Sequence, residues 1–98
     1  MGLTKADVMA LTKAFRDLVA PLRRSPAKDD RAFAEHLTFV ANRVLQRIRK
    51  EEWSKKTQEK IWKLLMRLFF VYEAYRRRKG EMSLLRWLRR IASVAQDS

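Results

Sequence analysis

Apolar residues recur every three or four positions along most of this chain, which is the spacing of one buried face of a helix. No stretch alternates between apolar and polar residues with the period of two that marks a strand. The pattern is interrupted three times, and short connectors of this kind are typical of helices that pack together in one domain. We therefore expect residues 1–98 to form a single all-α domain, a compact bundle of four helices at about 4–20, 29–50, 55–79 and 83–95.

The boundaries of the first two helices follow from local signals. Thr4 carries a hydroxyl that can cap the free amides of the first turn, and Pro21 ends or kinks the first helix just before it. A polar connector follows, which we expect to be a mobile loop. The second helix begins at Ser25–Pro26 or, by a small preference, at Asp29–Asp30. Residues 51–54 indicate a break before the third helix, although the second and third helices could also run on as one bent rod.

The third stretch, which Ser54 can cap, is the most apolar part of the chain. Within residues 61–72 only Lys63 and Arg67 are polar, and because they lie four apart they share one line along the helix. A helix that is apolar on most sides is typical of the centre of a bundle or of a contact with a second chain. It is too short and too charged to span a membrane. We therefore expect the central helix here, wrapped by the other three and ended by Gly80 in a left-handed conformation.

The composition argues against several kinds of chemistry. The chain has no cysteine, so it can form neither a disulfide nor a thiolate metal site. Its one histidine, His36, follows Glu35, and adjacent residues point to different sides of a helix. Two glycines cannot build a phosphate-binding loop. We expect no catalytic activity, no cofactor and no metal and, because the N-terminus lacks the features of a secretory signal, a cytoplasmic protein.

Charge changes this picture more than any single motif does. The chain has 23 basic and 11 acidic residues, a net charge of +12. Residues 1–30 carry a net charge of +2, and residues 31–98 carry +10. Folding gains nothing from repulsion between so many like charges. The positive electrostatic field of the protein therefore favours a polyanionic partner. Nucleic acid is the first expectation, an anionic membrane the second, and an acidic protein surface the third.

The corner between the third and fourth helices holds the densest group of cations. From Arg76 to Arg90 there are seven cations and one acid, Glu81. The planar fork of arginine can bond two phosphate oxygens at once, although cations at the C-terminus of a helix are also favourable without any ligand. The first group of candidate nucleic-acid-binding residues is therefore Arg76, Arg77, Arg78, Lys79, Arg86, Arg89 and Arg90.

A second strip of cations could extend this patch if the second and third helices lie side by side. No zinc finger, homeodomain-like arm or convincing helix-turn-helix accompanies it, so we expect contacts to the phosphate backbone with little sequence preference. Tyr75, Trp53 or Trp62 could stack on unpaired bases if exposed, but a place in the core is the more frequent role of such residues. The strip comprises Arg47, Lys55, Lys56, Lys60 and Lys63 as candidates, together with Arg43, Lys50 and Arg67.

The most specific local sequence lies at the end of the third helix. The run Leu68-Phe-Phe-Val-Tyr-Glu-Ala-Tyr75, followed by Arg76-Arg-Arg-Lys79 and Gly80, resembles the last long helix of the small α-helical subunits of CRISPR effector complexes. The resemblance covers residues 64–80. It implies a non-catalytic subunit that packs head-to-tail along the guide-RNA filament, with a basic face that steadies the guide-bearing heteroduplex or the displaced strand. The functional positions that it carries over are Arg76, Arg77, Arg78 and Lys79.

Two other interpretations of the same residues stay open. Trp53, Trp62 and Trp87, with many cations around them, also suit a bundle that binds the surface of an anionic membrane, which is a less favoured partner. Alternatively, Phe39, Trp62 and Phe70 could be surplus apolar surface of an adaptor or a homo-oligomer that docks on other protein subunits or on itself. These interpretations differ in the partner, not in the fold.

Overall fold

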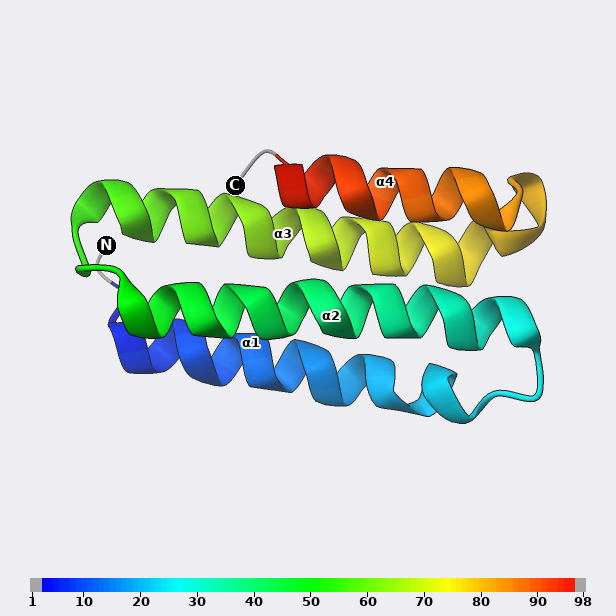
Figure 1. The fold of residues 1–98 in the computed structure, drawn as a ribbon, viewed down its shortest axis with the longest axis horizontal. Coiled ribbons are helices and arrows are strands. Elements are labelled where there is room, and N and C mark those ends of the chain that lie inside the picture. The colour runs from blue at the N-terminus through cyan, green and yellow to red at the C-terminus, as the bar shows by residue number, and fades with distance from the viewer. Residues whose placement is uncertain (1–2, 97–98) are drawn as a thin grey trace.

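Four α-helices and two short 3-10 turns make up the computed structural model, which describes residues 3–96. The helices are α1 (Lys5–Val19), α2 (Lys28–Lys50), α3 (Lys55–Arg78) and α4 (Leu84–Gln96). The turns are η1 (Ala20–Arg24), between α1 and α2, and η2 (Lys79–Glu81), between α3 and α4. The described residues contain no strand, and the expected all-α bundle of four helices is confirmed (Figure 1).

The helices form two antiparallel hairpins, α1–α2 and α3–α4, that pack on each other (Figure 1). α1 packs on both α2 and α3, and α4 likewise packs on both α2 and α3. α2 and α3 therefore lie diagonally across the bundle and touch each other little, although they are consecutive in the sequence. This arrangement places α3 and α4 together on one side of the molecule.

The expectation of a central third helix is wrong. α2 buries ten residues among those described, whereas α3 buries seven. Trp62 and Phe70 of α3 are exposed at 38% and 74%. In a bundle of four similar helices each helix has two neighbours, so only about half of its circumference is covered whatever its sequence. The surplus apolar side chains of α3 consequently reach solvent.

Most of the helix ends follow the local signals. The Thr4 hydroxyl accepts a hydrogen bond from the Asp7 amide (3.1 Å), and an Asp7 carboxylate oxygen accepts one from the Thr4 amide (3.3 Å). α1 ends at Val19, two residues before Pro21. The Ser54 hydroxyl accepts from the amide of Thr57 (3.1 Å), so α2 and α3 are separate helices. α2 begins at Lys28, one residue before the preferred start.

The two hairpin connectors have structure that the sequence analysis did not predict. The connector after α1, for which a mobile loop is expected, contains the 3-10 turn η1, and the Arg31 guanidinium donates to the carbonyls of Ser25 (2.7 Å) and Pro26 (2.9 Å). The expectation of a left-handed Gly80 is wrong, because no described glycine has a positive φ. Instead, the chain leaves α3 through η2, and the Trp87 indole donates to the carbonyl of Lys79 (3.3 Å). Contacts with neighbouring elements, rather than local residue preference, determine both connectors.

Candidate nucleic-acid interface

A shallow groove runs between α3 and α4 on the outer side of the bundle. Its α3 wall is formed by residues at alternating spacings of three and four, which place them on one line along the helix. One further turn of four residues at each end adds Lys56 and Arg78, which lie on the same side of α3. None of these positions is acidic. Of the two acids of α3, Glu73 approaches Arg76 and Arg77, whereas Glu59, three residues after Lys56 and four before Lys63, borders the line. The wall comprises Lys60, Lys63, Arg67, Phe70 and Ala74.

The α4 wall of the groove is basic as well. Arg90, Ser93 and Val94 line it. Arg86 and Arg89 precede Ser93 by seven and four residues, so they lie on the same side of α4. The Arg90 guanidinium lies over the Trp87 ring, 5.6 Å from its centroid. α4 has no acidic residue to offset these charges.

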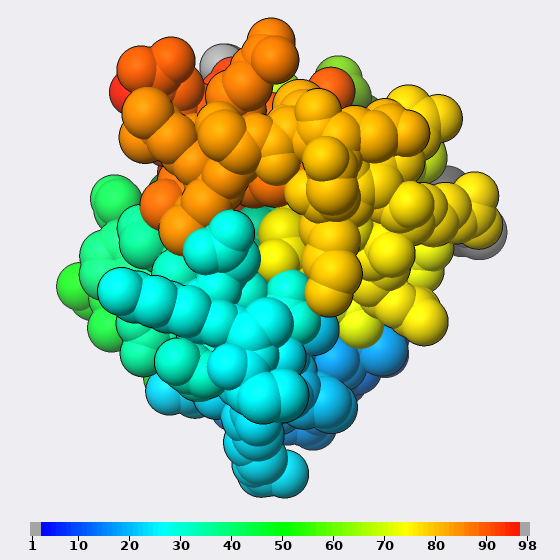
Figure 2. Space-filling view, turned by 90° about the vertical axis from the view of Figure 1, so that its right-hand side faces the viewer, coloured from blue at the N-terminus to red at the C-terminus, as the bar shows by residue number. Residues whose placement is uncertain are grey.

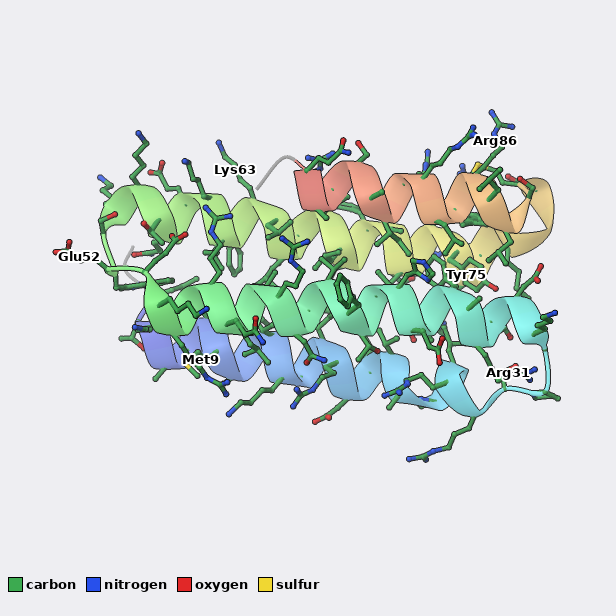
Figure 3. The ribbon with its side chains drawn as sticks, viewed as in Figure 1. Met9, Arg31, Glu52, Lys63, Tyr75 and Arg86 are labelled. Atoms are coloured by element: carbon green, nitrogen blue, oxygen red, sulfur yellow. The ribbon has the colours of Figure 1, made fainter. Side chains whose placement is uncertain are left out.

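Together the two walls form what we call the basic face, and Figure 3 shows Lys63 and Arg86 pointing toward the same edge of the molecule. It spans nearly the whole of α3, about 33 Å at 1.5 Å per residue. The longest dimension of the molecule is 39 Å. The basic face consists of Lys56, Lys60, Lys63, Arg67, Arg78, Arg86, Arg89 and Arg90.

The shortness of α4 brings further cations close to the basic face. α4 has 13 residues and α3 has 24, so α4 leaves part of the bundle uncovered (Figure 1). In that space lies a pocket that α2 lines with Arg43, Arg47 and Lys50. Leu64 lines both this pocket and the groove beside Lys60. Cations of α2 and of α3 thus line two adjacent pockets that meet at Leu64, although the two helices are diagonal neighbours.

The arginine-rich corner contributes less to this face than the sequence suggests. Its long side chains project from the end of the bundle (Figure 2), but Arg76 and Arg77 both approach Glu73, at 3.5 Å and 3.6 Å. Arg76 also lies over the ring of Tyr72, 5.8 Å from its centroid, on the side turned away from α4. Arg78 lies on the basic face, with Arg77 at its edge. The corner is therefore split between two sides of α3.

The remaining predicted site residues lie apart from the basic face. Lys55 is turned about 100° from Lys56 around the axis of α3. Lys79 is held by Asp30, with 3.4 Å between the ammonium nitrogen and each carboxylate oxygen. Arg47 lines the pocket beside α4 and donates to Glu51 at 2.6 Å. Seven of the twelve predicted residues therefore share one face.

The aromatic candidates for base stacking are placed differently from one another. Tyr75 is only 2% exposed, so it cannot stack on a base; its ring stacks on Phe33, with 3.8 Å between the ring centroids. Trp53 is half-buried and donates its indole N–H to the carbonyl of Leu3 (3.2 Å). Trp62 remains partly exposed on the flank of α3 away from the groove.

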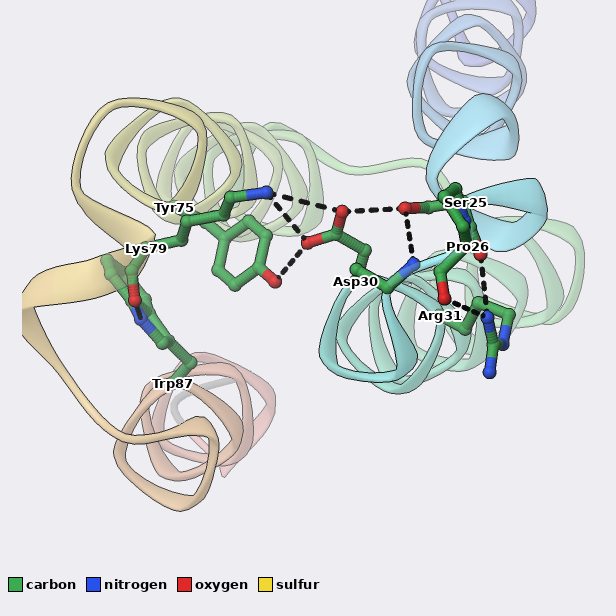
Figure 4. Close-up of polar contacts among 8 residues, drawn as sticks. Ser25, Pro26, Asp30, Arg31, Tyr75, Lys79 and Trp87 are labelled. Atoms are coloured by element: carbon green, nitrogen blue, oxygen red, sulfur yellow. Dashed lines mark hydrogen bonds and ion pairs between the residues drawn. The ribbon is translucent and has the colours of Figure 1, made fainter.

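Asp30 is a structural residue beside the candidate site whose role the sequence analysis missed. It is 5% exposed, and its carboxylate accepts hydrogen bonds from the hydroxyls of Tyr75 (2.6 Å) and Ser25 (2.8 Å) and from Lys79 (Figure 4). Burial raises the pKa of the Asp30 carboxyl, but these three hydrogen bonds and the charge of Lys79 outweigh it, so the pKa lies below its ordinary value. Burial and the bond to Asp30 raise the pKa of the Tyr75 hydroxyl far above its ordinary value.

This network joins the start of α2 to the end of α3, and it explains why Lys79 is engaged inside the molecule. A signal for it exists in the sequence. Asp30 precedes Phe33 and Leu37 at the spacing of the buried stripe of α2, so it is an acid at a core position. A buried acid is normally paired, so this spacing predicts a hydrogen-bond or ion-pair partner for Asp30, although it does not identify the partner.

Other chemistry finds little support among the described residues. His36 is exposed, and its Nδ1 lies 2.9 Å from the carbonyl oxygen of Ala32 in the preceding turn. Within residues 3–96 no cluster of three histidine or carboxylate side chains could hold a metal ion. In the same part of the chain, no helix combines the length and the apolar character that crossing a membrane requires.

Comparisons of the chain with protein-family models, with curated proteins and with solved structures find no match in any of the three. The resemblance of residues 64–80 to CRISPR small subunits stays a prediction. In the structure this segment is the second half of α3 with the start of η2. Its tyrosines, Tyr72 and Tyr75, are buried, and the basic run at its end is exposed.

Proposed function

We propose that this protein binds nucleic acid through the phosphate backbone, with little sequence preference, and that the basic face is the contact surface. One observation carries the proposal: cations from two helices gather along one groove that has no acidic side chain in either wall. Such a concentration of like charge opposes folding, and a partner rich in phosphates relieves it.

The shape of the surface supports backbone contacts rather than base reading. The cations lie along a groove of the bundle, and neither helix projects from the molecule in the way a recognition helix enters a major groove. Long, flexible side chains in a row suit phosphates that repeat along a strand. The length of the face, about 33 Å, is close to one turn of a duplex.

The proposal includes a role as a non-catalytic cytoplasmic protein that works with other subunits. The resemblance to CRISPR small subunits suggests one setting, in which a row of such proteins follows a guide-bearing ribonucleoprotein. The basic face would then steady the heteroduplex or the displaced strand. Only the phosphate contact itself is needed for the test that follows.

The test compares two variants with the same change in net charge. The face variant replaces Lys60, Lys63, Arg86 and Arg89 by Ala, and the control variant replaces Lys13, Arg23, Arg24 and Lys28, four exposed cations of α1, η1 and α2. Binding of labelled RNA and DNA is measured by fluorescence anisotropy at a series of salt concentrations. Each lost phosphate contact should lower the slope of log affinity against log salt by about 0.7–0.9.

We expect the face variant to lose up to about three units of slope and most of its affinity at moderate salt, while the control keeps its slope. Equal losses in both variants would show that net charge alone, and not this face, governs binding. Binding to anionic vesicles without binding to nucleic acid would overturn the proposal in favour of a membrane-surface role.

A further inference from the structure

Phe70 is exposed in the middle of the basic face. At 74% it is the most exposed of the large apolar side chains that the structure describes. It lines the groove between α3 and α4 together with Arg67 and Arg90. We propose that this protein takes single-stranded nucleic acid, with Phe70 stacking on an unpaired base while the neighbouring cations bind the phosphates; this inference rests on the proposed function.

The ring of Phe70 is open, unlike those of its neighbours. Phe69 packs edge-on against Phe15, with 4.8 Å between the ring centroids. Phe39, the next most exposed ring, has the guanidinium of Arg43 over it at 5.9 Å. Within residues 3–96 no ring and no cation covers Phe70 in this way. A flat partner can therefore approach it directly.

The setting of Phe70 decides which partner fits. In a duplex the faces of the bases are covered by stacking, so an exposed ring on the protein would meet only sugar and phosphate. In a single strand each base offers a free face, and stacking on an aromatic side chain is favourable for every base. The cations on both walls of the groove make an acidic strand a better occupant than an apolar protein surface. The geometry thus combines a stacking platform with a phosphate-binding groove.

The experiment measures binding of four labelled probes of equal length: oligouridine, oligothymidine, an abasic strand and a duplex. Phe70→Ala should weaken oligouridine and oligothymidine binding roughly 5- to 100-fold. It should change binding of the abasic strand and of the duplex less than about twofold, because these offer phosphates but no free base. Phe70→Trp should restore single-strand binding, and Phe70→Leu, which keeps an apolar side chain without a ring, should not.

Phe39→Ala is the matched control, because Phe39 is also an exposed phenylalanine, at 62%, and lies on α2, diagonal to α3. It should leave all four affinities unchanged. Equal losses on all four probes for Phe70→Ala, or rescue by leucine, would overturn the stacking role while the phosphate-binding function stands. If wild type binds none of the probes, the proposed function itself fails. A loss of self-association on Phe70→Ala, measured by sedimentation, with unchanged probe binding would identify Phe70 as a protein contact and overturn the inference.

Discussion

Asp30 engages two side chains inside the molecule that could otherwise contact a ligand. Its carboxylate holds Lys79 and the hydroxyl of Tyr75, which are two of the residues that the sequence offers as contacts for nucleic acid. The acid could be recognised as a core position from its spacing, but its partners lie 45 and 49 residues away. No local pattern reports contacts over such separations. The sequence analysis therefore placed Lys79 among the nucleic-acid contacts, and for Tyr75 it favoured the core without predicting the partner of its hydroxyl.

Replacing this acid should destabilise the fold. We expect Asp30→Asn to lower the free energy of unfolding by about 1–3 kcal/mol, because a buried, charged acceptor of three hydrogen bonds is lost. Asp29→Asn, in the same turn but exposed, should cost only a few tenths of a kcal/mol through the helix dipole. Urea unfolding followed by circular dichroism measures both values, and equal effects of the two substitutions would contradict the role given to the network.

The pH dependence gives a second readout of the same network. The folded state lowers the pKa of Asp30, so its stabilising contribution is fully present above the ordinary carboxyl pKa and is lost as the pH falls through the folded-state value. The stability difference between wild type and Asp30→Asn should therefore be constant near neutral pH and shrink below about pH 4. A difference that grows on acidification would mean that the carboxyl is protonated in the folded protein.

At the scale of the elements, the helices themselves were predictable and their roles were not. The buried stripe of α2, from Phe33 to Ile48, follows directly from the spacing of its apolar residues, and so does the cap at Ser54. The identity of the most buried helix did not follow. α3 is apolar over most of its circumference, yet α2 has more buried residues among those described, because η1 and two helices cover it. Apolar composition sets how much a helix can bury, whereas its neighbours set how much it does bury.

Gly80 allows a direct test at this scale. Because its φ is not positive and an added Cβ would meet no atom within 4 Å, Gly80→Ala should raise the free energy of unfolding by about 0.4–1 kcal/mol through a less flexible unfolded chain. Gly80→Asn is the control, since asparagine tolerates the left-handed conformation better than alanine does. Urea unfolding should rank alanine as at least as stable as asparagine. The opposite rank would show that the turn needs a left-handed residue.

For the whole molecule, the distribution of charge matters more than its total. The basic face gathers eight cations along one groove, and Glu59 is the acid of α3 that borders it, so mutual repulsion of these cations destabilises the folded state. Added salt screens this repulsion within roughly 10 Å at moderate ionic strength. We expect the midpoint of urea unfolding to rise from low to moderate sodium chloride in the wild type, and to rise less in the variant with alanine at Lys60, Lys63, Arg86 and Arg89. A midpoint that falls with salt would mean that the ion pairs, such as Lys79 with Asp30, outweigh the repulsion.

The sequence by itself determined the number and order of the helices, most of their ends, the buried stripe of α2 and the excess of positive charge. These are local properties, set by side-chain spacing, capping and composition within a few turns of one helix. Only the tertiary structure decided that α2 and α3 are diagonal, that α4 is too short to cover the opening beside Leu64, and that Phe70 lies between two basic walls. Such facts depend on which distant segments pack together, and packing is decided by the joint burial of all four helices rather than by any one of them.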